Sequence, residues 1–142
     1  MSLIHCIYSS ASTDKDLPKE ELEKILEQSR QNNAKVEVTG MLLYEDGAFF
    51  QVLEGEESVV NAVYKKIEMD VRHERVTKLI TEPIEERAFG EWTMGYPRVS
   101  RKELKEIDGL NDFFSQGKSF LELEQGRAKI LLKAFQKGKW RV

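Results

Sequence analysis

Residues 36–55 read VEVTGMLLYEDGAFFQVLEG, and this stretch decides the fold. Two apolar runs, 36–44 and 48–53, flank the pair Asp46-Gly47. An Asp-Gly pair between two such runs is among the strongest local signals for a β-hairpin. We therefore predict two strands joined by a tight turn at residues 46–47.

Further elements are predicted on both sides of this hairpin from the spacing of apolar residues. In chain order, the predicted elements are a strand at 3–8 that enters a loop at 9–12, a helix at about 18–33, the hairpin, a helix after residue 58 whose apolar stripe runs from Val60 to Val71, and strands at 76–82 and 91–96. This order is typical of an α+β, ferredoxin-like βαββαβ sandwich with one extra strand. We expect a five-stranded mixed sheet with two helices on one face.

The last third of the chain has a different pattern. A short polar helix is predicted at 101–107, followed by an amphipathic helix whose apolar stripe consists of Ala128, Leu131, Leu132 and Phe135. We divide the chain into a domain at 1–97 and a C-terminal helical extension or cap at 98–142. The apolar stripe favours self-association, although packing on the free face of the sheet would bury the same residues.

The composition excludes several classes of protein. Among 142 residues, 22 are Lys or Arg and 25 are Asp or Glu, for a net charge of −3, whereas a duplex binder needs a basic footprint. One cysteine, Cys6, and two histidines, His5 and His73, are too few and too scattered for a zinc cluster, so no metal is expected. The chain shows neither a signal-peptide pattern nor a run of about 18 apolar residues. We expect a cytoplasmic protein that does not bind membranes.

Polar residues stand where the first predicted helix should bury apolar ones. Ser29 continues the apolar stripe of this helix, Asn33 follows four residues later, and Asn32 lies seven residues after Ile25. A buried amide without partners costs about 1–3 kcal/mol, so these groups need hydrogen-bonding partners. The alternative is that the two asparagines only end the helix, where Asn is common.

Tyr8 and Gln51 are predicted to lie next to each other. In a ferredoxin-like sheet the first strand is central and pairs with the second strand of the hairpin. This pairing brings Tyr8, at the end of the first strand, beside Gln51, in the middle of the second hairpin strand. Tyr8, Gln51 and the polar end of the first helix would then converge on one cavity, suited to a flat, polar-edged ligand such as a purine, pterin or flavin. Taken singly, each residue is equally a core residue with a satisfied polar group.

Several motifs, in the same order along the chain, resemble one known family. They are Ile7-Tyr8-Ser9-Ser10, Ser29 with Asn32-Asn33, Thr39-Gly40-Met41-Leu42, Phe49-Phe50-Gln51-Val52-Leu53-Glu54-Gly55, Asp70 with Arg72-His73, and Phe89 with Trp92 and Met94. Over about residues 2–97 the chain resembles the BLUF domains, which are blue-light sensors using FAD. The resemblance implies FAD, with FMN as an alternative, held noncovalently between the two long helices.

The resemblance also implies roles for individual residues. Tyr8 would donate an electron and a proton to the excited flavin, and Gln51 would then rotate or tautomerise and produce a reversible red-shifted state. Trp92 and Met94 would lie on the route of the signal. The residues implied to bind the cofactor are Ser29, Asn32, Asn33, Gln51, Lys66, Ile67, Asp70, Arg72 and His73.

Some of these assignments have alternatives. Lys66 is equally part of a solvated helix face, and Glu37 stands where members of the family often have a small residue such as glycine. No family motif covers the residues after 97, so the protein partner that receives the signal is unidentified. We expect a homo-oligomeric photoreceptor that is not an enzyme and signals through protein contacts.

Three other functions are compatible with this kind of fold but fit the residues less well. An RNA-binding RRM would need the basic and glycine pattern that Phe49-Phe50 lacks, and the chain is acidic. An acylphosphatase would need an anion-binding loop, but residues 9–15 contain neither glycine nor arginine. A flavin-free scaffold of the same fold would not require Tyr8 and Gln51, both of which are present.

Overall fold

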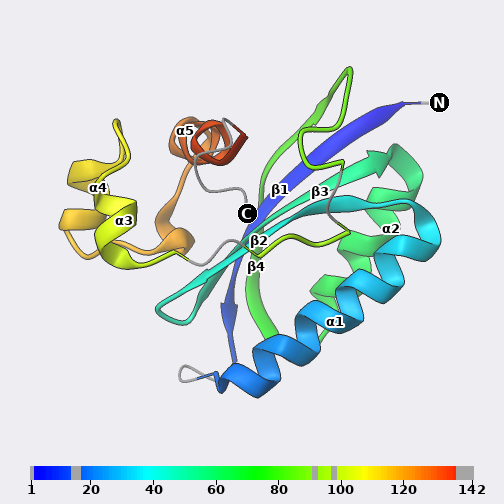
Figure 1. Ribbon diagram of the computed structural model, residues 1–142, viewed down its shortest axis with the longest axis horizontal. Coiled ribbons are helices and arrows are strands. Elements are labelled where there is room, and N and C mark those ends of the chain that lie inside the picture. The colour runs from blue at the N-terminus through cyan, green and yellow to red at the C-terminus, as the bar shows by residue number, and fades with distance from the viewer. Residues whose placement is uncertain (1, 14–16, 91–92, 97–98, 137–142) are drawn as a thin grey trace.

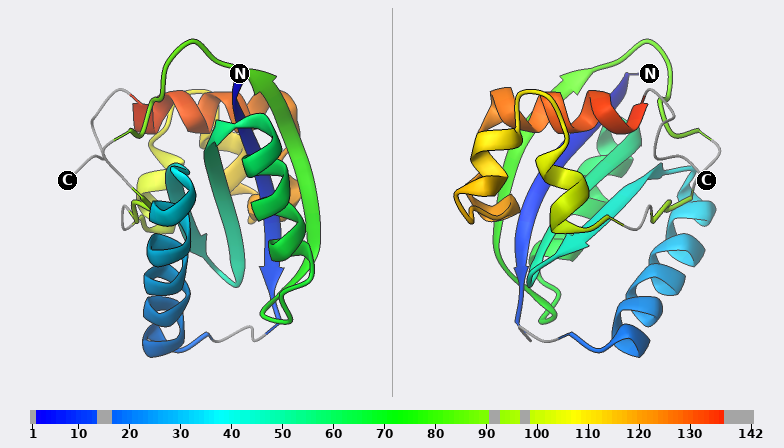
Figure 2. Two further views of the ribbon diagram at one scale, coloured as in Figure 1. Left: turned by 90° about the vertical axis from the view of Figure 1, so that its right-hand side faces the viewer. Right: turned by 60° about the vertical axis from the view of Figure 1, so that its left-hand side comes forward.

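The computed structural model describes residues 2–13, 17–90, 93–96 and 99–136. The strands are β1 (Leu3–Ser12), β2 (Thr39–Glu45), β3 (Ala48–Glu56) and β4 (His73–Pro83). The helices are α1 (Lys19–Val36), α2 (Glu57–Glu68), α3 (Arg101–Lys105), α4 (Asn111–Ser115), the 3-10 helix η1 (Phe120–Glu122) and α5 (Gln125–Gln136). One sheet separates two groups of helices: α1 and α2 lie on one side and α3 to α5 on the other (Figures 1 and 2).

The sheet has the predicted centre. Its strand order is β2-β3-β1-β4, and every neighbouring pair is antiparallel. The hairpin is confirmed: Asp46 and Gly47 form its turn with φ angles of 52° and 76°, the positive region that this residue pair tolerates. Tyr8 pairs directly with Gln51 in the β1–β3 register, as predicted.

The five-stranded sheet is not confirmed, because the described residues form four strands. The fifth strand is expected at 91–96, of which 91–92 lie outside the described residues; the described part, 93–96, forms one parallel bridge, between Met41 and Gly95. Gly95 donates to the carbonyl of Gly40 at 2.9 Å and accepts from the amide of Leu42 at 2.8 Å. The carbonyl of Thr93, which would extend this ladder, instead accepts from a side chain of α1, as described below.

Other boundaries also differ from the predictions. The first helix extends to Val36, so β2 begins at Thr39 rather than at residue 36. Residues 9–12 belong to β1 rather than to a loop, because this central strand is paired with β3 on one edge and β4 on the other, which satisfies its backbone and buries its serines. Val71 does not continue α2. It lies in the turn after the helix and its side chain is 84% exposed.

The end of α1 shows which backbone conformation residue 37 adopts. Glu37 caps this helix in the left-handed region, with φ of 57°, and its backbone N–H donates to the carbonyl of Asn33. Glycine adopts this conformation without steric cost, whereas a residue with a Cβ is strained there. Glycine, which the resemblance implies at this position, would therefore suit this backbone conformation better than Glu37.

The two faces of the sheet carry separate apolar cores. Alternate residues of β1 and β3, including Tyr8 and Phe49, pack with α1 and α2, whereas Ile7 and Phe50 pack with the C-terminal helices. The stripe on α5 is buried in this second core and contributes Ala128, Leu131, Leu132 and Phe135. Of the two expectations for this stripe, packing on the sheet is the one that the structure contains.

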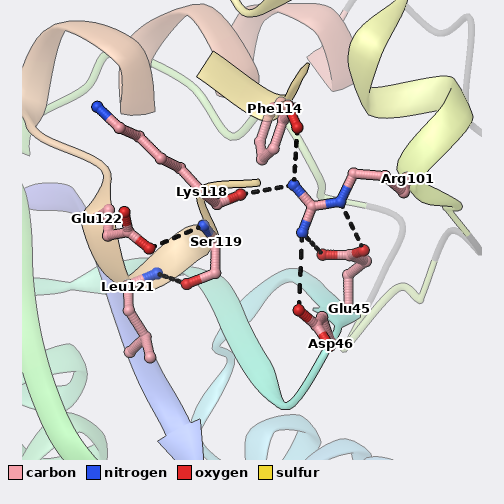
Figure 3. A network of polar contacts seen from close by, with 8 residues as sticks. All are labelled: Glu45, Asp46, Arg101, Phe114, Lys118, Ser119, Leu121 and Glu122. Atoms are coloured by element: carbon pink, nitrogen blue, oxygen red, sulfur yellow. Dashed lines mark hydrogen bonds and ion pairs between the residues drawn. The ribbon is translucent and has the colours of Figure 1, made fainter. Parts of the chain in front are cut away.

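A polar network fastens the C-terminal helices to the hairpin (Figure 3). Arg101, at the start of α3, binds the carboxylate of Glu45 with two hydrogen bonds of 2.8 and 3.0 Å. Its remaining terminal nitrogen donates to the carbonyls of Phe114 and Lys118. One guanidinium group therefore joins the tip of β2 to the segment between α4 and η1.

Within the described residues, no helix combines the length and apolarity that crossing a bilayer requires.

Candidate functional site

Tyr8 lies at the centre of the face covered by α1 and α2. Its side chain is fully buried, and its hydroxyl has no hydrogen-bond partner within the described residues. The ring meets Tyr64 of α2 edge to face, with centroids 5.4 Å apart. Burial holds the pKa of the Tyr8 phenol well above its usual value, and the neighbouring Cys6 and Tyr64 act in the same direction. Tyr8 is therefore a neutral phenol whose hydroxyl can donate a hydrogen bond to a partner.

Gln51 is the side chain next to Tyr8 across the strand pair. It is buried, and its Nε2 donates to the sulfur of Met94 at 3.3 Å. A thioether is a weak acceptor, so this contact holds the amide less firmly than an oxygen acceptor would. The amide can therefore exchange this partner for a better one at small cost.

Asn33 binds the chain segment at residues 93–95, which contains Met94, from the side of α1. Its side chain is buried on α1, and Nδ2 donates to the carbonyl of Thr93 at 2.9 Å. Arg30, one turn earlier on α1, donates from Nε to the carbonyl of Met94 at 3.0 Å. Residues 93–95 are thus bonded to α1, β2 and β3 at once. The motif analysis missed Arg30, which is largely exposed and carries no apolar-face signal.

The predicted polar stripe of α1 is correct at one position and wrong at another. Asn33 is buried and Ser29 is half-buried, but Asn32 is exposed. The buried residues of α1 are Leu22, Ile25, Leu26 and Asn33, so the stripe narrows to a single position near the helix end. Helical spacing alone places Asn32 on the same face as Ile25, and it does not show that near the helix end only Asn33 is buried.

A second group of predicted residues gathers where α2 turns into β4. Asp70 accepts hydrogen bonds from the backbone and the guanidinium of Arg72, and this contact lowers the pKa of the carboxyl. His73 bonds through Nδ1 to the hydroxyl of Ser10 at 3.0 Å, and burial lowers the pKa of its imidazole. Its ring centroid lies 4.7 Å from that of Phe49, two residues before Gln51 on β3.

The remaining predicted residues differ in how close they lie to this group. Ile67 is half-buried and packs against the core that contains Tyr8. Lys66 is exposed on α2, which agrees with the alternative of a solvated helix face. Trp92 lies outside the described residues. The part of the chain that the structure describes contains no cluster of His, Cys, Asp or Glu that could hold a metal ion.

Cavities open along α1 near these residues. One of about 440 Å³ lies between α1 and the turn that carries Arg72, and is lined by Lys24, Glu27, Gln28, Gln31 and Arg72. A larger one, of about 760 Å³, lies on the other flank of α1 beside Tyr96 and Val99. The smaller cavity is lined by one predicted residue, Arg72, and the larger one by none, so we relate the smaller one to the Asp70–His73 side of the site.

The residues fit a flavin in chemical terms. A flavin ring has hydrogen-bond donors and acceptors along one edge, and the site offers a buried phenol without a partner and two buried amides, Gln51 and Asn33. Arg72 supplies a cation at the mouth for a phosphate, and its bond to Asp70 holds it in place.

Comparison with known proteins agrees with this chemistry. A family model described as BLUF, sensors of blue-light using FAD, matches residues 3–95. Photoactivated adenylate cyclase subunit beta from Euglena longa is 38% identical over 106 residues, which are 73% of this chain and 12% of that protein.

Solved structures are similar over nearly the whole chain. The photo-activated state of BlsA has a TM-score of 0.83 and 32% identity, and the match covers 99% of each chain. The dark state of BlrB, described as a BLUF protein, has a TM-score of 0.71 and 29% identity over 94% of this chain and 97% of that one. The chain therefore spans a small part of the cyclase and nearly all of the two structures.

Proposed function

Because this chain belongs to the BLUF family of blue-light sensors that use FAD, we propose that its photochemistry runs through Tyr8 and Gln51 and is reported by Met94. The observation that carries the proposal is the direct pairing of Tyr8 with Gln51, together with the bond from Gln51 to the Met94 sulfur. All three side chains are buried, and Met94 belongs to a chain segment outside the four-stranded sheet.

Cofactor binding divides between two groups of residues. The ring would be held by the amides of Asn33 and Gln51, with Ser29, Asn32 and Ile67 around it. Lys66, Asp70, Arg72 and His73 would hold the ribityl and phosphate part. Of these four, Arg72 is the strongest candidate for a phosphate, because its planar guanidinium binds oxyanions with two hydrogen bonds.

The protein's part in the photocycle follows from the groups present. When bound and illuminated, the flavin supplies a strong one-electron oxidant. Tyr8 gives up an electron and then its hydroxyl proton, and takes both back, so no bond of the chain is permanently changed. The Gln51 side chain differs between the dark state and the state after illumination. The two ends of its amide differ in donor and acceptor character, and rotation or tautomerisation exchanges which end donates and which accepts. The donor bond to Met94 is then lost.

Signal output then depends on a segment with two arrangements. Residues 93–95 lose one of their contacts when Gln51 changes, and a difference of one hydrogen bond, about 1 kcal/mol, moves a two-state population severalfold. We propose that the changed segment is read by another protein or by a second copy of this chain, and that the chain itself is not an enzyme. Size measurements in darkness and under blue light test self-association, and a monomer in both states would exclude it.

The RRM alternative gains no support from the fold. Phe49 and Phe50, the aromatic pair that would have to stack on bases, are both fully buried, one on each face of β3. An RRM displays such rings on an open sheet, and here α1 and α2 cover one face and the C-terminal helices the other.

The central experiment is absorption spectroscopy of the purified protein. It should show a flavin spectrum that blue light shifts reversibly to longer wavelength, and reconstitution with FAD or FMN separates the two cofactors. Tyr8→Phe and Gln51→Leu should keep the flavin and abolish the shift. Tyr44→Phe and Gln116→Leu are matched controls, because Tyr44 pairs with Phe49 in the sheet and Gln116 is exposed at the end of α4. A normal photocycle in either test variant would refute the roles assigned.

Binding is tested separately from photochemistry. Asn33→Ala should weaken flavin retention, because a buried hydrogen-bonding amide is lost. Asn32→Ala, at an exposed position of the same helix turn, should have the smaller effect. Equal retention in Asn33→Ala and the unaltered protein would remove Asn33 from the binding residues.

A further inference from the structure

Glu54 is a fully buried carboxylate to which neither the motif analysis nor the proposed photochemistry assigns a role. It lies on β3, three residues after Gln51. Its Oε1 accepts from the Thr39 hydroxyl and from the backbone N–H of Phe89, both at 3.0 Å. Its Oε2 accepts from the backbone N–H of Ala88 at 2.7 Å.

Burying an ionised group is expensive unless hydrogen bonds compensate it. Glu54 meets this condition through donors from two other parts of the chain: the start of β2 and the segment that follows β4. Arg87 reinforces the junction, because its Nη1 donates to the Thr39 hydroxyl at 2.8 Å and to the backbone carbonyl of Glu54 at 3.1 Å. The carboxylate thus fixes where the chain lies at residues 88–89.

The position of this junction relates it to the photochemical site. Phe89 is fully buried in the core that β3 shares with the C-terminal helices, whereas Met94 is buried in the core beneath α1 and α2. The chain therefore changes from one face of the sheet to the other between these two residues. β3 holds it on both sides of this change, through Glu54 at Phe89 and through Gln51 at Met94.

We propose that Glu54 is a positioning residue for the contact between Gln51 and Met94. By anchoring the amides of Ala88 and Phe89, a few residues before Met94 in the chain, the carboxylate limits where Met94 can lie and so stabilises the resting arrangement of its sulfur against the Gln51 amide. Its effect on recovery in darkness rests on the proposed function, but its effect on the position of Met94 does not.

The test variant is Glu54→Gln, which keeps the size of the side chain. An amide can accept at one end only, so its NH₂ must face either the N–H of Ala88 or that of Phe89, and one anchor is lost. Glu45→Gln is the matched control, since Glu45 is also a strand carboxylate held by hydrogen bonds but its partner is Arg101.

The first measurement is NMR of the methionine methyl groups in the full-length protein without flavin. The chain has four methionines, and Met69, which is 83% exposed, serves as an internal reference. Glu54→Gln should shift or broaden the Met94 methyl resonance and leave that of Met69 unchanged. Amide exchange at residues 88–89 should become about tenfold faster, as expected for the loss of about one hydrogen bond.

The second measurement is the rate of recovery in darkness of the flavin-loaded protein. Glu54→Gln should recover about fivefold more slowly, because the resting arrangement has lost part of its support. Glu45→Gln should match the unaltered protein in both measurements.

Arg87→Ala keeps the proposal open to refutation if Glu54→Gln does not fold, because Arg87 is only half-buried and supports the same junction. It should change the Met94 resonance and the recovery rate in the same direction by a smaller factor. An unchanged Met94 resonance in every variant that folds overturns the proposal. If the unaltered protein shows no light-induced shift, the photochemical proposal fails, whereas the NMR result without flavin still decides the position of Met94.

Discussion

Removing the guanidinium of Arg101 should detach the C-terminal helices from the hairpin. Its fork makes two hydrogen bonds to Glu45, at 2.8 and 3.0 Å, and the two side chains are 24% and 13% exposed. A bidentate, mostly buried pair of this kind is worth more than a surface ion pair, which contributes about 0–1 kcal/mol. A hydrogen bond to a charged group stabilises the folded state by about 1.5–3 kcal/mol, and partial access to water weakens it. We therefore expect a coupling energy of about 1–2 kcal/mol between Arg101 and Glu45.

The two backbone bonds add to the cost of the substitution. Arg101→Ala also leaves the carbonyls of Phe114 and Lys118 without this donor, at about 1 kcal/mol each. We expect Arg101→Ala to lower the free energy of unfolding by about 3 kcal/mol and the melting temperature by roughly 10 °C. Arg101→Lys should recover less than half of this loss, because an ammonium cannot reproduce the planar fork.

A double-mutant cycle in urea unfolding measures the coupling directly. It compares Arg101→Ala, Glu45→Ala and the double variant. Asp46→Asn is the control, since Asp46 is 74% exposed with its Oδ2 3.9 Å from the guanidinium and Asn tolerates the same positive φ, and it should change stability by less than about 0.5 kcal/mol. A coupling energy below about 0.3 kcal/mol would mean that the Arg101–Glu45 contact does not hold the C-terminal helices to the hairpin.

Three further predictions concern the pH dependence and packing of the same scaffold. Burial holds the pKa of His73 below its usual 6.5, so the unfolded chain binds the proton more readily, and stability should fall as pH drops below about 6.5. His73→Gln should flatten this slope in urea unfolding between pH 7 and 5, and a steeper slope would contradict the assignment. Leu131→Ala, in the core under α5, should cost about 2–5 kcal/mol, whereas the 36% exposed Ile130→Ala should cost much less; equal losses would refute packing on the sheet. Gly40→Ala would place a methyl 1.9 Å from the carbonyl oxygen of Val52, so it should cost about 3 kcal/mol or more, and a neutral result would show that β2 can move.

The sequence was informative where a local pattern alone determines geometry. The Asp46-Gly47 turn and the alternation through Phe49 and Gln51 depend on residues next to each other, and both predictions hold. The pairing of Tyr8 with Gln51 needed the ferredoxin-like topology as well, but a central first strand leaves few registers that bury both apolar runs.

The errors arose where distant contacts outweigh local composition. Residues 9–12 are rich in serine and suggest a loop, but strands on both edges satisfy their backbone and make them part of β1. Asn32 and Asn33 cannot be distinguished by helical spacing, because only the position of the sheet under the last turn of α1 decides which is buried. No local pattern reveals the partners of Glu54, because its carboxylate is held by amides 34 and 35 residues away.

The strength of the contacts around Gln51 indicates which element can respond to it. β3 is paired along its length with both β1 and β2, so displacing it would break many backbone hydrogen bonds together. The segment at 93–95 is held to the sheet by one bridge, by a weak bond from Gln51 to sulfur, and by side chains of α1. A change worth one or two hydrogen bonds can move the second element but not the first. The change at Gln51 should therefore reach the C-terminal helices by way of Met94 and Phe89 rather than through the strands, and this route passes the carboxylate of Glu54.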